Sequence, residues 1–187
     1  MKLRDDWMIC AWGIAMALLL AGGAVMAGET SDTATVLGKL HHSNQMEIEM
    51  GRLAIQRGQA NGVTSFGTML VHDHTASDQQ VVALAMREKI DLASVTPAVT
   101  MTGGNMAKLR TLKGMAFDKA FARAMLEGHT QDVDEAKAAR DRTTDGALRV
   151  LLASTIPTLE QHRDIAQRLV DTLATAPNVA GANMPAK

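Results

Sequence analysis

The chain has 187 residues, and its 19 lysines and arginines nearly balance its 20 aspartates and glutamates, for a formal net charge of −1. The two signs are interspersed, so the sequence does not predict the basic surface of a nucleic-acid-binding protein. The sequence shows no serine–histidine–aspartate order, no phosphate-binding glycine loop and no nucleophilic cysteine. No motif of these kinds therefore indicates a hydrolase.

Residues 1–27 are predicted to be a signal peptide. The run from Met8 to Ala27 is uncharged and ends with small residues, Val25 and Ala27, where signal peptidase recognises its substrates. We expect cleavage after Ala27 and export to the periplasm. Because the run is about twenty residues long, an uncleaved anchor that leaves the domain facing the periplasm is the alternative. The single cysteine, Cys10, lies in this leader, so no disulfide is expected in the domain.

Residues 28–175 are predicted to form one helical domain. The first helical pattern runs from Thr33 to Ile90 and is broken by the turn sequence GQANG at residues 58–62, which indicates an antiparallel helix pair. After a connection rich in proline, glycine, serine and threonine, two further helices are expected over residues 115–142 and 145–174, with Asp145 or Thr144 as the N-cap of the second. The tail, 176–187, has two prolines and no periodicity and is predicted to be disordered. The expected fold is all-α, an up-down four-helix bundle of ferritin-like topology.

Helical periodicity separates the histidines of the stretch LVHDHTASD, residues 70–78. His72 and His74 project about 200° apart on a helix, so they cannot both face the core. His74 is in register with Leu70 and Val81, whereas His72 falls with polar neighbours. The same test predicts one inward polar group on each of the four helices: Glu47, His74, His129 and His162. Asn44, Asp78 and Asp132 lie three or four residues from these groups and are expected to support them.

Two arrangements would satisfy these inward groups. In the first, one divalent metal ion takes three imidazole nitrogens and one carboxylate oxygen, a ligand set that favours zinc over iron or copper. In the second, the groups lie at different heights and form hydrogen bonds with one another, with Asn44 or with water. A dinuclear carboxylate centre is disfavoured, because Glu127 and Glu160 each stand two residues from a histidine and so project away from it.

A second constellation consists of His41, His42, Met46 and Met50, the last three of which form a stripe with a spacing of four. Imidazole and thioether ligands suit copper in an exported protein. Methionines at helical spacing more often fill gaps in a core, and this second interpretation is the stronger one.

Four blocks of the sequence carry a family resemblance: NQMEIEMGRLA, VTSFGTMLVHDHTASD, FDKAFARAMLEGH and LRVLLASTIPTLEQH. Over about Val36 to Leu173 the chain resembles the exported bacterial proteins known as domain of unknown function 4142, described as ferritin-like bundles of the periplasm or outer envelope. The resemblance implies a four-helix domain with no established reaction. The family pattern falls on Asn44, Glu47, Asp73, His74, Phe117, Asp118, His129, Pro157, Leu159 and His162, and it leaves out His41, His42 and His72.

The sequence therefore favours an exported, non-catalytic protein of the bacterial cell envelope that binds a metal ion or small ligand in its interior. The alternative is a mononuclear metal enzyme, an oxidoreductase or a hydrolase, built on the glutamate and the three histidines. An enzyme needs an open coordination position and a pocket that reaches it. Membrane association through the N-terminal segment is the one partner interaction that the sequence suggests.

Overall fold

The computed structural model describes residues 21–95 and 106–175, with side chains described for residues 32–95 and 106–175. Its long elements are α1 (Ala21–Arg57), α2 (Asn61–Arg87), α4 (Gly114–Arg142) and α5 (Gly146–Thr175), and a short 3-10 helix, η1 (Leu92–Ser94), follows α2. No strand occurs in these ranges, so the predicted all-α class is confirmed for them. The predicted tail 176–187 and most of the predicted leader lie outside the described residues.

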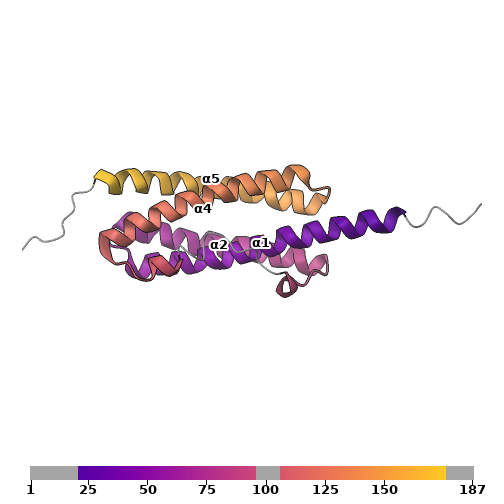
Figure 1. Ribbon diagram of the computed structural model, residues 1–187, viewed down its shortest axis with the longest axis horizontal. Coiled ribbons are helices and arrows are strands. Elements are labelled where there is room, and N and C mark those ends of the chain that lie inside the picture. Colours follow the sequence, from indigo (N-terminus) through magenta and orange to yellow (C-terminus); the bar gives the residue numbers. More distant parts are fainter. Residues whose placement is uncertain (1–20, 96–105, 176–187) are drawn as a thin grey trace, which may run out of the picture.

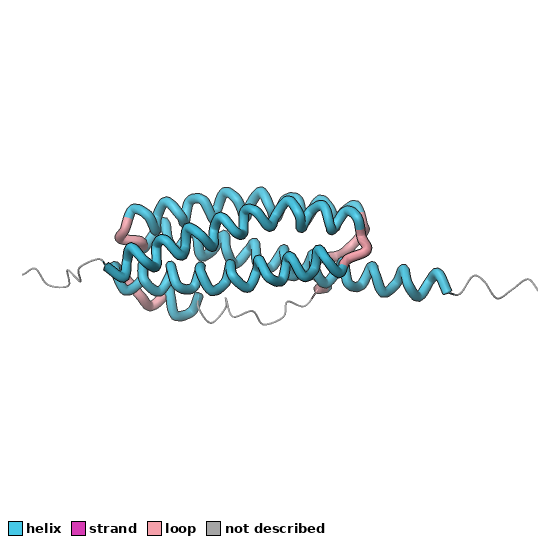
Figure 2. Tube along the Cα trace, turned by 90° about the horizontal axis from the view of Figure 1, so that it is seen from above, coloured by secondary structure: helices cyan, strands magenta, loops and turns pink. Residues whose placement is uncertain are grey.

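The long helices pack as two pairs that lie side by side. Short connections join α1 to α2 and α4 to α5, and in Figure 1 the two partners of each pair run alongside each other. Contacts of α2 with α5 and of α1 with α4 join the pairs. Figure 2 shows the result as one elongated body from which the N-terminal part of α1 projects. Within the described residues, no helix has the length and apolar character needed to cross a membrane.

The break between α1 and α2 lies at the predicted turn, and α4 holds it in place. The first helix ends at Arg57 and the second begins at Asn61. The side chain of Asp118, which is fully buried on α4, accepts hydrogen bonds from the backbone N–H groups of Gln59 and Ala60 at 3.0 and 2.7 Å. A carboxylate from another helix thus satisfies amides at the start of α2, which has no side-chain cap of its own.

The break between α4 and α5 is capped locally, as the sequence predicts. Asp145 immediately precedes α5, and its Oδ1 accepts hydrogen bonds from the backbone N–H groups of Ala147 and Leu148 at 2.8 and 3.0 Å. These are two of the amides that a helix leaves unpaired at its first turn. The capping residue therefore fixes where α5 begins, and with it the height of every later residue on that helix.

Two glycines let α1 and α2 approach closely. A Cβ built at Gly51 would lie 2.7 Å from the carbonyl oxygen of Gly67, and a Cβ built at Gly67 would lie 2.7 Å from the carbonyl oxygen of Gly51 and 2.8 Å from the Cβ of Ala54. Both distances are shorter than real Cβ contacts, so neither position has room for a larger side chain. This close approach brings the α1 residues around Glu47 near the α2 residues around His74.

The apolar interior is divided into two clusters. One contains Met50, Leu70, Met125 and Ala166, together with the aromatic group of Phe66, Phe117 and Phe121. The other contains Leu37, Val81, Val133, Leu148, Leu152 and Leu159. On each long helix the inward polar residue lies in sequence between the two clusters. A polar layer therefore interrupts the core at one level across all four helices.

We predict that Gly67→Ala destabilises the fold. Alanine favours a helix by up to about 1 kcal/mol over glycine, but the clash with the backbone oxygen of Gly51 costs more, about 1–3 kcal/mol. The matched control is Gly146→Ala, where a Cβ meets nothing within 4 Å. Urea denaturation should show a lower free energy of unfolding for Gly67→Ala and an unchanged or higher one for Gly146→Ala. Equal stability of the two variants would contradict the close packing.

Candidate metal centre

Four polar side chains occupy the layer between the apolar clusters, one from each long helix. Glu47 on α1 is 2% exposed, His74 on α2 is 4% exposed, and His129 on α4 and His162 on α5 are both 0% exposed. These are the four residues that helical periodicity turns inward. Burial of this kind is costly for polar groups unless each finds a partner.

The three imidazoles converge. Each of His74, His129 and His162 offers a ring nitrogen, and these three nitrogens all lie within 4.8 Å of one another. The ring centroids of His129 and His162 are 5.2 Å apart, and those of His74 and His162 are 5.3 Å apart. Phe66 packs edge-on against His162, with centroids 5.7 Å apart, and closes the side toward the aromatic cluster. The rings therefore meet at one height, with an apolar wall on one side.

Two of the rings are oriented by neutral oxygen acceptors. The Nδ1 of His74 donates a hydrogen bond to the side-chain oxygen of Asn44 at 2.9 Å, and Asn44 in turn donates to Ser77 at 3.3 Å. The Nδ1 of His129 donates to the backbone carbonyl of Met125 at 3.0 Å. Because a carbonyl oxygen only accepts, the proton lies on Nδ1 in both rings. The Nε2 of each ring is then left with an unprotonated lone pair.

The third ring is oriented by a carboxylate. The Nε2 of His162 donates to Oδ2 of Asp73 at 2.9 Å, and the other oxygen of Asp73 accepts from the exposed His72 at 2.7 Å. Burial alone would raise the pKa of Asp73, but the hydrogen bonds from His72 and His162 outweigh that effect and lower it. Asp73 therefore stays ionised and holds the proton of His162 on Nε2. The lone pair of His162 lies on Nδ1, which faces the cluster.

Four buried oxygen and nitrogen atoms in this layer have no hydrogen-bond partner among the described residues: Oε2 of Glu47, Nε2 of His74, Nε2 of His129 and Nδ1 of His162. The three nitrogens are acceptors, so they cannot bond to one another. Burial lowers the pKa of His74 well below its ordinary value, with a further contribution from the two neighbouring rings, and it lowers the pKa of His129 to about 4. The imidazoles are therefore neutral at pH 7 and in the form that ligates metals.

The carboxyl group of Glu47 lies in a strongly desolvated place. Burial raises its pKa from 4.5 to about 8. Asp132, one turn beyond Gly128 on α4, is half-buried nearby, and its pKa is also raised to about 8, first by burial and then by the charges of Glu47 and Glu135. Two acids in one small region thus compete for ionisation. A cation bound to Glu47 would favour the ionised form of both acids.

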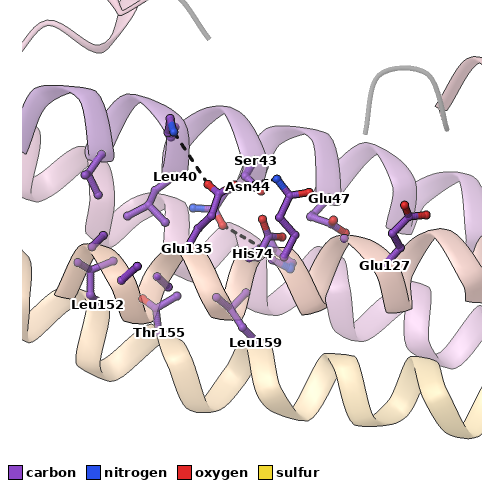
Figure 3. A pocket seen from close by; sticks show the side chains of 18 of the residues that line it. Leu40, Ser43, Asn44, Glu47, His74, Glu127, Glu135, Leu152, Thr155 and Leu159 are labelled. Carbon is purple, nitrogen blue, oxygen red and sulfur yellow. Dashed lines mark hydrogen bonds and ion pairs between the residues drawn. The ribbon is translucent and has the colours of Figure 1, made fainter. Parts of the chain in front are cut away.

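A cavity reaches the layer from the seam between α1 and α4. Its volume is about 320 Å³, and Asn44, Glu47, His74 and Asp132 are among the residues that line it. Figure 3 draws Glu47 and His74 among the side chains that line the cavity, with a dashed line for the hydrogen bond between His74 and Asn44. The polar layer is therefore closed by Phe66 on one side and open to this cavity on another.

The scan against family models matched a family described as a domain of unknown function, DUF4142, over residues 21–169. That range covers most of the chain and all four inward polar residues. The chain belongs to the DUF4142 family. Comparisons of this DUF4142 chain with curated proteins and with solved structures found no match.

The other site residues predicted from the sequence of this DUF4142 chain are not part of the group of three converging imidazoles. Asp78, predicted to support the cluster, instead accepts hydrogen bonds from His41 and Gln45, each at 2.7 Å. His72 is exposed, as its register predicts. Met50 is buried in the apolar core and Met46 packs against it, which fits their interpretation as core residues.

The acids two residues from His129 and His162 do not join the converging ring nitrogens, as their spacing predicts. Glu127 is exposed, and Glu160 forms an ion pair with Lys137 at 2.6 Å. Among the described residues, Glu47 is the fully buried carboxylate of the layer, Asp73 bonds the outer nitrogen of His162, and Asp132 lines the cavity. This arrangement does not supply the glutamates and the Glu-x-x-His pairs of a dinuclear carboxylate site.

Sequence reasoning missed the role of Asp73. Its helical register groups it with neither the core nor the cluster, and its partner His162 lies 89 positions away in the sequence. The available signal was chemical: a carboxylate next to one predicted ligand is a common partner for the second ring nitrogen of another.

We predict that the metal-free protein loses stability as the pH rises from 6.5 to 8. The folded imidazoles are neutral in this range, and the unfolded ones lose their last protons between pH 6.5 and about 7.5, which partly offsets the loss. Folded Glu47 keeps its proton up to a pKa of about 8, whereas the unfolded chain has released it. The folded state therefore binds more protons, and its stability falls with rising pH by about 2 kcal/mol over this window for Glu47 alone. Urea denaturation in the presence of a chelator measures this loss.

The comparison variants are Glu47→Gln and Glu49→Gln. Glutamine at position 47 removes the ionisable group and should reduce the loss between pH 6.5 and 8, leaving the part that Asp132 contributes. Glu49 is on the same helix but is exposed and pairs with Arg110, so its variant should keep the wild-type slope. The same slope in all three proteins would show that Glu47 is not desolvated in the fold.

Proposed function

We propose that this chain binds one divalent metal ion in its interior, as a non-catalytic protein of the bacterial cell envelope. The proposal includes an up-down four-helix bundle of ferritin-like topology that is exported to the periplasm. The observation that carries the metal is the set of four unpartnered buried atoms, on Glu47, His74, His129 and His162. One atom comes from each long helix.

The energetic argument compares the cluster with and without an ion. Leaving a polar atom buried without a partner costs about 1–3 kcal/mol, so four such atoms cost as much as a sizeable fraction of the stability of a typical domain. Hydrogen bonds within the layer recover only part of this, because three of the atoms are acceptors and the protonated Glu47 offers a single donor. A cation satisfies all four at once. The metal therefore accounts for the arrangement better than a core of mutually bonded histidines.

The ligand set favours zinc. Three neutral imidazole nitrogens and one carboxylate oxygen match the nitrogen and oxygen donors of tetrahedral zinc sites. Iron and copper accept the same donor types, but nothing in the layer supplies the additional carboxylates of an iron pair or the sulfur ligands that select copper. The hydrogen bonds from the opposite ring nitrogens to Asn44, Met125 and Asp73 are the outer contacts that metal-bound histidines characteristically make.

Export rests on the predicted leader. An uncharged run followed by small residues before Gly28 supports cleavage after Ala27, with a periplasmic domain as the product. The test is to recover the protein from the periplasmic fraction of cells that express the full chain and to sequence its N-terminus. A start at Gly28 supports the proposal, and an intact leader in the membrane fraction supports the anchored alternative.

A mononuclear metal enzyme is the second candidate function, because the cavity reaches Glu47 and His74. An ion held there would have a side through which water or a substrate could approach, which catalytic zinc sites require and structural ones lack. Turnover by the zinc-loaded chain that is lost in Glu47→Gln would favour this candidate over simple binding.

We predict that zinc raises the melting temperature of the untagged full chain by about 10 °C when its free concentration is a thousandfold above Kd. His129→Leu should abolish this rise, because it removes one of four ligands. Its metal-free form should be no less stable than the wild type, since an apolar side chain replaces a buried ring whose Nε2 lacks a partner. His42→Leu, a histidine outside the cluster, should keep the full rise. Melting curves with zinc and with chelator measure both effects.

No change in melting temperature with zinc, cobalt, copper or iron would overturn the proposed metal centre. A rise in melting temperature that survives in His129→Leu but is lost in His42→Leu would indicate that the ion binds at the second constellation, around His41 and His42. The metal-free stability of His129→Leu also serves as a folding check for that variant.

We predict that Asp73→Ala weakens zinc binding about 10–100-fold without removing a ligand. The substitution frees Nε2 of His162, so the ring loses the contact that fixes its tautomer and its orientation. The matched control is Asp78→Ala on the same helix, because its carboxylate holds His41 and Gln45 rather than a cluster histidine. Competition with a chromophoric chelator measures both affinities. Equal losses in the two variants would show that Asp73 has no specific part in the centre.

A further inference from the structure

The cavity between α1 and α4 has two chemically different ends. Toward the polar layer it is lined by Glu47, His74 and Asp132, and away from that layer it is lined by Leu40, Ala136 and Leu152. Figure 3 shows this order along the helices, with Leu40 and Leu152 at one side of the view and Glu47 and Glu127 at the other. Its volume, about 320 Å³, lies in the range of pockets that bind small molecules.

We propose that this cavity binds a small neutral molecule with an apolar body and one oxygen donor, such as an alcohol or a phenol, whose oxygen approaches the metal. The proposal rests on the proposed function, since the metal supplies the partner for that oxygen. It adds a ligand class and a binding mode to the metal centre.

The polar end opens onto Glu47, one of the proposed metal ligands. Oε2 of Glu47 is buried and has no partner among the described residues, although its side chain lines the cavity. Gly128 faces it from α4, and a Cβ built there would lie 3.9 Å from Oε1 of Glu47. The absence of a side chain at this position leaves the approach to Glu47 uncovered. A small oxygen group has room to enter there.

The opposite end favours an apolar body. Val36, Leu40, Ala139, Leu152 and Leu159 line it, together with Lys39 and Arg142, and Thr155 donates a hydrogen bond to the carbonyl oxygen of Leu151 on its own helix. A polar group placed against these walls would lose its hydration and gain no hydrogen bond. Hydrocarbon or aromatic groups gain from burial in the same place.

The charges around the polar end exclude an anionic head. Glu47, Glu127 and Asp132 line this part of the cavity, and Glu135 lines it one turn further along α4. Lys39 is 4.0 Å from Glu135 and pairs with it. Arg142 stands ten residues beyond Asp132, about 15 Å along the helix. An anion at the metal would meet carboxylates with no nearby free cation, and a cationic head would be repelled by the metal ion.

The test uses the full chain loaded with cobalt, whose visible absorption reports its ligands. Benzyl alcohol and benzoate are the probes, because they share one aromatic body and differ in the charge of the oxygen group. We expect benzyl alcohol to change the cobalt spectrum and to bind at least tenfold more tightly than benzoate. Cobalt binding with no spectral or thermal response to benzyl alcohol would overturn the cavity ligand and leave the metal centre standing. Tighter binding of benzoate would overturn the neutral class.

Cavity-filling variants locate the site. Ala136→Leu narrows the apolar end from α4, and Thr155→Leu narrows it from α5, so either variant tests the proposal if the other does not fold. Each should keep its cobalt affinity and lose at least tenfold in affinity for benzyl alcohol. Ala76→Leu, on an exposed part of α2 outside the cavity, should keep both. Unchanged alcohol binding in a folded filling variant would place the molecule elsewhere, and failure of cobalt itself to bind would refute the metal centre and this inference together.

Discussion

The structure depends on how four buried polar atoms are accommodated at one level of an apolar interior. Glu47, His74, His129 and His162 interrupt the core on all four long helices, with an apolar cluster on either side of them. Water would ordinarily hydrate such groups, and the surrounding side chains do not replace it. The layer is therefore a source of instability unless something outside the described chain binds there.

The contacts around the layer fix the direction of the unused lone pairs. An amide oxygen, a backbone carbonyl and a carboxylate each take the proton of one imidazole, so the opposite nitrogen of every ring faces the other two. In a histidine that is simply packed in a core, one ring nitrogen forms a hydrogen bond and the direction of the other nitrogen is not set by any partner. Here three rings are oriented independently toward a common point. This convergence distinguishes a binding centre from three separately packed residues.

Much of this arrangement follows from the sequence, and the reason is local. The 3.6-residue period identifies the inward face of each helix, and the GQANG turn and the Asp145 cap mark where helices end and begin. His74 and His72 separate for the same reason. These features depend only on neighbours within a few turns, so one sequence is enough to predict them.

The remaining features depend on how the helices are placed relative to one another. The pairing of Asp73 with His162 requires the relative height and rotation of α2 and α5, which periodicity does not contain. Asp78 illustrates the same limit, because its spacing from His74 suggested a supporting role while its position next to α1 gives it His41 and Gln45 as partners. The cavity is likewise a property of the seam between α1 and α4, where small residues such as Gly128 and Ala136 leave space.

Anomalous diffraction from a zinc-soaked crystal of the protein, recorded on both sides of the zinc absorption edge, tests the central claim most directly. The account predicts one strong anomalous peak within ligand-bond distance, about 2 Å, of Nε2 of His74, Nε2 of His129 and Nδ1 of His162, with a carboxylate oxygen of Glu47 as the fourth protein ligand. A well-ordered layer with no peak at that point, or with zinc bound only at surface side chains, would contradict it.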